Sequence, residues 1–297
     1  MVAALAAAVV AVARSWPEVQ EALERTEPWV LVAAGLVAPV YLVATMFAWR
    51  AVLGDLGSRL SLWDSFAVFF VSQLGKYLPG SLWNVVAAAE LGADRRVPRR
   101  RSLTAMGVTL LMALAAGSAL GVVGLLLAPS QAQERFGLAA WVAPVFVVLA
   151  LPPVTNRLAT VALRVLRRPP LEHALTVAGA AIGFGWTLVG WLLAGLHVWL
   201  LAIATGMAPT LGSYLVCTGG YALAWIVGFL AIPVPAGLGV REVILVAVLS
   251  QSLDAGSVIV VVLLSRVLLT AADLALAGYA SVVGSRHWRR SGGPVPS

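Results

Sequence analysis

The sequence predicts an all-α polytopic membrane protein with two inverted repeats, each holding a re-entrant helical hairpin broken by proline and glycine. Three observations support this fold class. Hydrophobic residues make up 61% of the chain and charged residues only 11%, whereas soluble domains carry about 25% charge. The apolar runs are long and continuous, unlike the short alternating segments of a transmembrane barrel. Two of these runs are interrupted by Pro and Gly at matching positions.

The length of each apolar run decides whether it can span the membrane, because a spanning helix needs about 20 apolar residues. Residues 1–13 are apolar but short. Ala-Val-Ala at 11–13 resembles a signal-peptide cleavage site, yet no basic region precedes it, which favours a short or truncated first span. We expect roughly six to eight membrane helices plus the hairpins. The predicted spans are 28–49, 103–128, 138–154, 178–204 and 256–283, and the broken runs are 62–91 and 210–250.

The two broken runs define the repeats. A backbone break at membrane depth is tolerated only where protein or water satisfies the freed groups, so each run is predicted to be a hairpin that enters and leaves on one side. Repeat A then covers about 28–128 and repeat B about 178–283, and a single linker span at 138–154 inverts the second relative to the first. Such matched interruptions mark the binding site in inverted-repeat transporters. Residues 1–284 form one transmembrane domain, followed by a basic, disordered tail at 285–297.

The arginines test this topology. The chain carries a net charge of +7, and Lys76 is its only lysine. Basic residues concentrate in cytoplasmic loops, so the C-terminus is predicted to be cytoplasmic and the protein to lie in the plasma membrane. The other side receives Arg14, Arg25 and Arg135. The cytoplasmic side receives Arg50, Arg59, Arg95, Arg96, Arg99, Arg100, Arg101, Arg157, Arg164, Arg167, Arg168, Arg286, Arg289 and Arg290.

Cofactor, metal and nucleic-acid chemistry are not expected. The single cysteine, Cys217, excludes an intramolecular disulfide, and the three histidines lie far apart in the sequence. No phosphate-binding GxxxxGK[ST] motif is present, so ATP would not power transport within this chain. The Arg95–Arg101 cluster is interpreted as a topology and lipid-headgroup determinant rather than a nucleic-acid patch.

Six charged residues are expected to lie at membrane depth. Each costs about 2.5–3.5 kcal/mol on insertion scales, so they are candidates for function. Lys76 lies in the first break, and Arg241 and Glu242 follow the second. Both breaks precede helical patterns, whose N-terminal N–H groups suit an anion such as phosphate. The remaining three are Arg266, Glu90 and Asp273.

Several of these charges also have a structural interpretation. Arg266 and Asp273 lie seven residues apart on one helical face and are candidates for a buried ion pair. Glu90 and Asp64 are interpreted as interfacial, and His197 as an ordinary buried residue. Because adjacent helical residues diverge by about 100°, either Arg241 faces the cavity while Glu242 pairs with a neighbouring span, or the reverse holds.

The two breaks resemble signatures of a known family. Gly75-Lys76-Tyr77-Leu78-Pro79-Gly80-Ser81-Leu82-Trp83 and Pro233-Val234-Pro235-Ala236-Gly237-Leu238-Gly239-Val240-Arg241-Glu242 are similar to motifs of the flippase-like transmembrane domain of lysylphosphatidylglycerol synthases and its stand-alone relatives. Ala236 departs from the glycine expected there. The candidate binding residues are Lys76, Tyr77, Pro79, Gly80, Trp83, Asn84, Pro235, Gly237, Gly239, Arg241, Glu242, Arg266 and Asp273.

The resemblance implies a protein that moves a phosphate-bearing lipid between leaflets without ATP and is not itself an enzyme. The lipid would be a polyprenyl-phosphate sugar or an anionic or aminoacyl phospholipid, made by a lipid-modifying enzyme on a separate chain. One alternative is a secondary transporter of a small anionic solute, which would need a closed polar pocket. Another is a membrane glycosyltransferase, for which only Glu18–Glu27 and Glu134 offer acidic residues outside.

Overall fold

The computed structural model describes residues 28–78, 83–127, 143–231 and 239–290, together with Pro17, Gln20 and Glu24. Every regular element within these ranges is a helix, and five helices are long and apolar enough to cross a membrane, which confirms the all-α polytopic fold class. In chain order the elements are α3 (Pro28–Asp55), α4 (Leu62–Gln73), η1 (Leu74–Tyr77), α5 (Trp83–Ala93), α6 (Arg99–Leu127), α8 (Ala143–Ala150), α9 (Pro152–Val165), α10 (Val177–Ala204), α11 (Leu211–Leu230), α12 (Val240–Leu249) and α13 (Ala255–Arg290).

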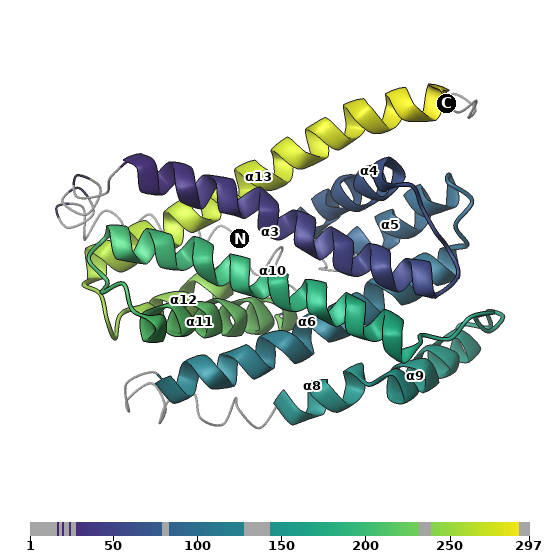
Figure 1. Ribbon diagram of the computed structural model, residues 1–297, viewed down its shortest axis with the longest axis horizontal. Coiled ribbons are helices and arrows are strands. Elements are labelled where there is room, and N and C mark those ends of the chain that lie inside the picture. The colour runs from purple at the N-terminus through teal and green to yellow at the C-terminus, as the bar shows by residue number, and fades with distance from the viewer. Residues whose placement is uncertain are drawn as a thin grey trace.

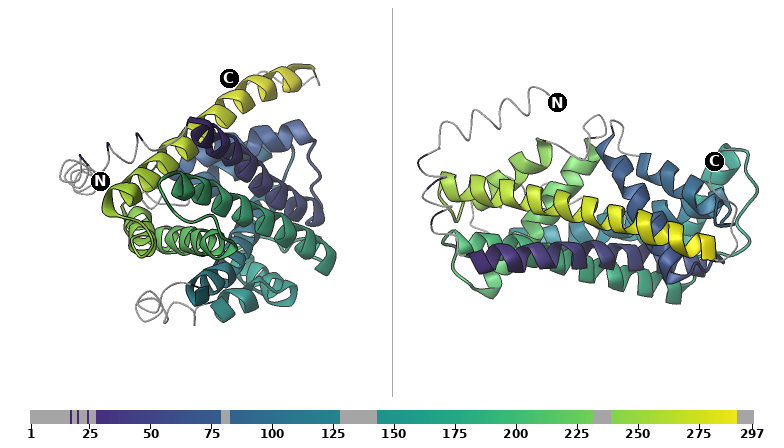
Figure 2. Two further views of the ribbon diagram at one scale, coloured as in Figure 1. Left: turned by 60° about the vertical axis from the view of Figure 1, so that its left-hand side comes forward. Right: turned by 90° about the horizontal axis from the view of Figure 1, so that it is seen from above.

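The same order of elements occurs twice. A long helix, a broken helical pair and a second long helix run from α3 to α6 and again from α10 to α13. The α4–α5 hairpin lies at one end of the molecule and the α11–α12 hairpin at the other, as both sets of views show (Figures 1 and 2). This placement agrees with hairpins that enter from opposite sides. The inverted symmetry of the two repeats stays a prediction, and residues 1–13 lie outside the described residues.

The first hairpin is too short to span a bilayer. Its arms, α4 and α5, have 12 and 11 residues. At about 1.5 Å per residue each arm rises less than about 20 Å, whereas the hydrocarbon core is about 30 Å thick. Ser61 begins α4 by accepting a hydrogen bond from the Asp64 N–H at 3.1 Å. Neither arm is therefore long enough to cross the hydrocarbon core by itself, and η1 follows directly on the first arm. That this hairpin is re-entrant stays a prediction.

The second hairpin has unequal arms, which differs from the sequence prediction. Its first arm, α11, has 20 residues and counts as a span by itself, whereas α12 has 10. The sequence predicts a single broken run at 210–250, in which the prolines and glycines of Pro233–Gly239 separate the two arms, and it does not indicate that the first arm is long enough to span. The longer α11 begins with a capping box, in which Thr210 and Ser213 each accept a hydrogen bond from the other's backbone N–H.

The predicted linker span at 138–154 is not a straight helix. Among its described residues, α8 ends at Ala150 and α9 begins at Pro152, with a bend of 77° between them. Pro152 and Pro153 cause the bend, since a proline disfavours helical backbone in the preceding residue, and Leu151 is extended at φ −64°, ψ 135°. Exposed Arg157 and Arg164 project from α9.

The long helices hold the two repeats together. Along α3 and α10, Phe47 stacks on Trp186 with ring centroids 4.8 Å apart. His197 of α10 is fully buried, with its ring nitrogens 2.9 Å from the Ala34 carbonyl of α3 and 3.1 Å from Ser265 Oγ of α13. This contact pattern agrees with the interpretation of His197 as a packing residue. Helix α13 continues to Arg290, beyond the predicted end of the span at 283.

Candidate functional site

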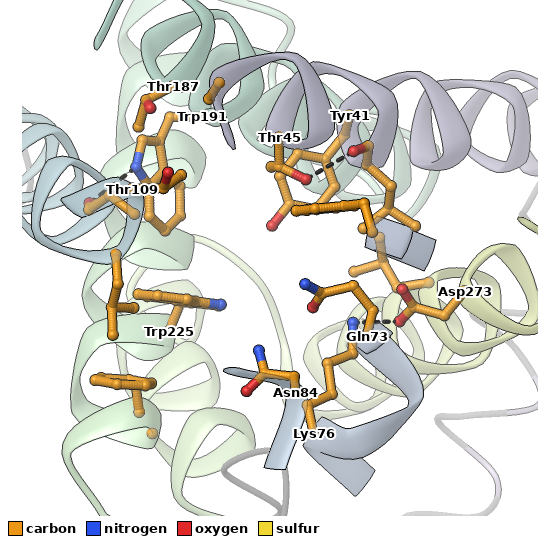
Figure 3. Close-up of a pocket in the computed structure, with 18 of the residues that line it drawn as sticks. Tyr41, Thr45, Gln73, Lys76, Asn84, Thr109, Thr187, Trp191, Trp225 and Asp273 are labelled. Atoms are coloured by element: carbon orange, nitrogen blue, oxygen red, sulfur yellow. Dashed lines mark hydrogen bonds and ion pairs between the residues drawn. The ribbon is translucent and has the colours of Figure 1, made fainter. Parts of the chain in front are cut away.

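A cavity of about 230 Å³ lies where the two hairpins meet the long helices (Figure 3). Both repeats contribute side chains to it, from α3, α4, η1, α5 and α6 of the first repeat and from α10, α11, α12 and α13 of the second. Its polar and charged lining residues are Tyr41, Thr45, Gln73, Lys76, Tyr77, Asn84, Thr109, Thr187, Tyr221, Arg241, Arg266, Thr270 and Asp273.

The tip of the first hairpin is anchored to α13 through one carboxylate. Lys76 Nζ lies 2.6 Å from Asp273 Oδ2, and the Tyr77 hydroxyl donates to the same oxygen at 2.7 Å. The tip can be this tight because Gly75 packs on the second arm. A Cβ on Gly75 would stand 2.6 Å from the Asn84 backbone nitrogen. Any larger residue at position 75 would therefore push the two arms apart.

The tip of the second hairpin is anchored to the same helix with the charges reversed. Glu242 Oε1 lies 3.3 Å from Arg266 Nη1 of α13, while its Oε2 accepts the Gly239 N–H at 2.6 Å and caps α12. Gly239 has φ +90°, a left-handed conformation that glycine adopts without strain. Arg241 points the other way, into the cavity, with its guanidinium 4.3 Å from the Tyr221 ring centroid. The structure thus shows the first of the two arrangements expected for Arg241 and Glu242.

The charges of the site do not cancel. Each carboxylate is paired with a cation from another element, Asp273 with Lys76 and Glu242 with Arg266. Arg241 is stacked on an aromatic ring, and no carboxylate of the described residues lies within 4.0 Å of its guanidinium nitrogens. Three cations therefore face two acids, which leaves one positive charge centred on Arg241.

The rest of the cavity wall is aromatic or neutral. Trp225 stacks on Phe229 at 8° between ring planes, and Trp191 meets Trp225 edge-on. Trp191 is fixed by its Nε1–H, which donates to the Ala113 carbonyl at 3.1 Å. Across the cavity, Asn84 Oδ1 is buried and has no hydrogen-bond partner within the part of the chain that the structure describes (Figure 3). Buried polar atoms are normally paired, so this oxygen is available to a ligand.

The structure brings most of the predicted site residues together. Lys76, Tyr77, Asn84, Arg241, Arg266 and Asp273 line the cavity. Glu242 does not line the cavity but caps α12, and Gly239 is the residue at which α12 begins. Trp83 is half exposed and lies outside the cavity lining. Pro79, Gly80, Pro235 and Gly237 lie outside the described residues.

One predicted interaction has different partners. Arg266 and Asp273 share a face of α13, but the structure pairs each with the tip of a different hairpin. The aromatic wall and Tyr41 were not among the site residues predicted from the sequence. A signal was present, since Tyr221, Trp225 and Phe229 are spaced by four residues and therefore line one face of α11.

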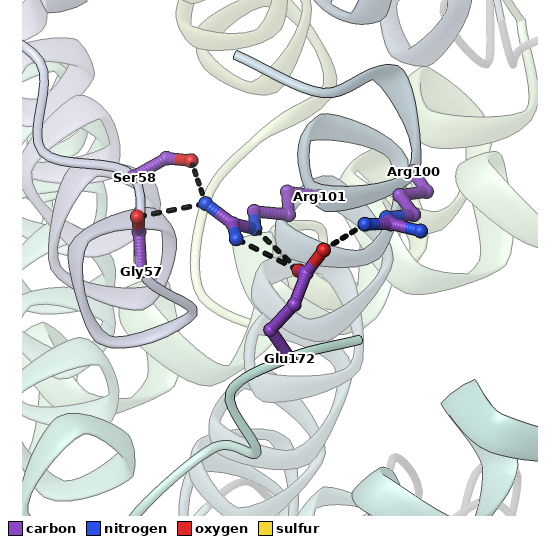
Figure 4. Close-up of polar contacts among 5 residues, drawn as sticks. All are labelled: Gly57, Ser58, Arg100, Arg101 and Glu172. Atoms are coloured by element: carbon purple, nitrogen blue, oxygen red, sulfur yellow. Dashed lines mark hydrogen bonds and ion pairs between the residues drawn. The ribbon is translucent and has the colours of Figure 1, made fainter. Parts of the chain in front are cut away.

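A second charged cluster ties together the loops at the α4–α5 end of the molecule (Figure 4). Glu172 pairs with both Arg100 and Arg101, and Arg101 also donates to the Gly57 carbonyl at 2.8 Å and to Ser58 Oγ at 3.0 Å. The Arg101 guanidinium lowers the pKa of the Glu172 carboxyl below its usual value of 4.5.

Neighbouring charges at this end are paired as well. Glu90 forms a bidentate pair with Arg99, and Asp64 pairs with Arg95. Both acids lie near the ends of their helices, as the interfacial interpretation expects. The Arg95–Arg101 cluster therefore makes ion pairs within the protein.

Comparison with known families agrees with the resemblance carried by the two breaks. Residues 1–277 match the model of the lysylphosphatidylglycerol synthase TM region. The chain belongs to this family. A search of curated proteins found no match. The family assignment rests on nearly the whole chain, including both long-helix and hairpin units, and it confirms the family predicted from the motifs around Lys76 and Arg241.

Proposed function

We propose that this member of the lysylphosphatidylglycerol synthase TM family moves a phosphate-bearing lipid between the leaflets of the plasma membrane without ATP. The observation that carries the proposal is Arg241, a cation at the tip of a broken helix that faces a shared cavity and has no carboxylate partner among the described residues. Arginine can hold two phosphate oxygens at once, and Lys76 stands on the opposite hairpin as a point charge.

The lipid tails have a suitable surface beside the site. Leu78 and Trp83 flank the first break and are 53% and 50% exposed, and Leu230 precedes the second break at 50%. At membrane depth such apolar side chains face hydrocarbon. The tails would stay in the bilayer against these residues while the headgroup occupies the cavity, so only the headgroup has to exchange water for protein contacts.

The two hairpin anchors offer a way to alternate access. Each tip is bound to α13 through one ion pair, to which Tyr77 adds a hydrogen bond at the first tip, and the two sites lie two helical turns apart on that helix. A phosphate that draws Lys76 away from Asp273 would loosen the first tip while the second stays fixed. Rocking of one repeat against the other is the usual form of such cycles. No chemical step on the lipid is part of this proposal, and the lipid would be made by a separate enzyme.

The test is transfer of lipid in reconstituted vesicles. Purified full-length protein is incorporated into vesicles containing phosphatidylglycerol with a fluorescent acyl chain, without nucleotide, and a membrane-impermeant reductant reports how much label reaches the outer leaflet. We expect faster transfer than in protein-free vesicles and a large loss with Arg241→Gln. Arg157→Gln, an exposed arginine on α9, is the control and should transfer normally. Equal rates with and without protein would reject the function.

A further inference from the structure

Helix α9 carries a surface that the central cavity does not explain. We propose that α9 lies in the plane of the membrane and binds the anionic lipid surface at the α4–α5 end of the molecule. This goes beyond lipid transfer, because it concerns the outside of the protein and holds whichever lipid is moved. Three features carry it, namely the direction of α9, the fixed orientation of its faces and the side chains on its outer face.

The bend before α9 turns this helix away from the direction of the spans. Helix α8 lies alongside α6, one of the five candidate spans, and α9 leaves α8 at an angle of 77° (Figure 1). A helix that turns so far from a membrane-crossing direction runs closer to the membrane plane than to its normal. The helix also ends sharply, since Arg167 has φ +53° and the Arg168 N–H donates to the Leu163 carbonyl at 2.8 Å.

The inner face of α9 is fixed to the rest of the protein. Asn156 Nδ2 donates to the Leu175 carbonyl at 2.9 Å, and Asn156 Oδ1 accepts the Leu175 N–H at 2.9 Å. Thr155 and Leu163, on the same side of the helix, are buried. Because rotation of α9 about its axis would break these contacts, its outer face has one orientation.

The outer face of α9 presents an apolar strip. Leu158, Val161 and Val165 are spaced by three and four residues, so they share one side of the helix. They are 41%, 48% and 76% exposed. Apolar residues at this spacing form the hydrophobic side of an amphipathic helix, which in a membrane-surface helix enters the boundary between headgroups and acyl chains.

Positive charge without an acidic partner lies beside this strip. Arg164, Arg167 and Arg168 are exposed, and no carboxylate of the described residues lies within 4.0 Å of their side-chain nitrogens. Four arginines of the neighbouring α5–α6 segment are instead paired with acids of the protein, namely Arg95, Arg99, Arg100 and Arg101. Arginines clustered next to an apolar strip suit anionic phosphate headgroups at the membrane surface.

Quenching of a single fluorophore tests both the position of α9 and its lipid preference. In a Cys217→Ala background, the full chain is labelled at Val161→Cys or at Thr160→Cys, which is exposed and turned about 100° from it on the helix. The vesicles contain phosphatidylcholine and phosphatidylglycerol in both leaflets, so that transfer between leaflets does not alter the result. Aqueous iodide should quench the label at residue 160 and leave the label at residue 161 largely unquenched.

The lipid preference is measured with acyl chains that carry bromine, which quenches on contact. Brominated phosphatidylglycerol should quench the label at residue 161 about threefold more than brominated phosphatidylcholine, because each arginine near the surface attracts anionic lipid. Arg164→Gln/Arg168→Gln should abolish this preference. Arg59→Gln/Arg96→Gln is the matched control, since it removes two exposed arginines from the loops at the same end, and it should keep the preference.

Equal access of iodide to the two labels would overturn the in-plane position of α9. Equal quenching by the two brominated lipids, or a preference that persists unchanged in Arg164→Gln/Arg168→Gln, would overturn the anionic lipid surface as the partner. A label at residue 161 that is shielded from iodide and quenched by neither lipid would show that protein covers the strip, which also overturns the proposal. These outcomes leave lipid transfer untouched, because the central cavity takes no part in the measurement.

Discussion

Replacing Asp273 by asparagine removes the charge that anchors the first hairpin and keeps the size of the side chain. Asp273 is almost fully buried, and its Oδ2 lies 2.6 Å from Lys76 Nζ. At an effective dielectric constant of about 20, two unit charges at this distance attract by about 6 kcal/mol before desolvation is counted. The Tyr77 hydroxyl can still donate to the asparagine oxygen.

The net loss should be smaller than that attraction. Breaking a fully buried pair costs about 3–5 kcal/mol, and the Lys76 side chain is 27% exposed, so water partly replaces the lost partner. We expect Asp273→Asn to lower the free energy of unfolding by about 2–3 kcal/mol. For a chain of 297 residues that corresponds to a melting temperature about 3–5 °C lower.

Thermal unfolding in one detergent, with Lys76→Gln, Asp273→Asn and the double variant, measures this effect. The double variant should be less destabilised than the sum of the two single variants, since it leaves no unpaired charge. The free Lys76 of Asp273→Asn should also make added phosphatidylglycerol raise the melting temperature more than in the unmodified protein. An unchanged melting temperature, or strictly additive losses, would refute the reasoning.

Three further results are expected. Gly75→Ala should destabilise the protein and slow lipid transfer because its Cβ would overlap the Asn84 backbone, whereas Gly107→Ala, with open space around it, should be neutral or slightly stabilising in the same melting assay. The pKa of Glu172 is lowered by Arg101, so this pairing stabilises the protein fully above pH 4.5 and is lost as the pH falls through the lower folded pKa; Glu172→Gln should therefore make the melting temperature less dependent on pH below about pH 4.5. In a Cys217→Ala background, Ala208→Cys should react with an impermeant maleimide added outside intact cells and Arg59→Cys should not; the opposite pattern would reverse the predicted topology.

The membrane fold could be predicted from the sequence because its main signal is the length of the continuous apolar segments. The long helices and the proline and glycine interruptions are local features, and both hairpins follow from them. The bend at Leu151 was missed because an apolar run at 138–154 satisfies the length criterion, although Pro152 and Pro153 already indicated a break. That α11 alone has 20 residues was also missed, because the apolar run 210–250 was treated as one broken segment.

The charged part of the site was predictable and its pairing was not. A charge in an apolar segment is conspicuous, so Lys76, Arg241 and Asp273 could be selected without any structure. Their partners depend on tertiary contacts, since Tyr77 and Asp273 are 196 residues apart in the chain. The aromatic wall escaped because tryptophan and phenylalanine are ordinary in a membrane helix, and Trp225 becomes distinctive only when the cavity beside it is known.

We propose that the two hairpin tips form one anion site. Lys76 and Arg241, which line the same cavity from opposite repeats, should then act on the same phosphate. The most direct measurement is a double-mutant cycle on the binding of phosphatidylglycerol to the purified protein, with Lys76→Ala, Arg241→Ala and the double variant. We expect the losses in binding free energy to be coupled by about 0.5 kcal/mol or more, since residues that act on one ligand are not independent. Strictly additive losses would contradict a shared headgroup site between the repeats.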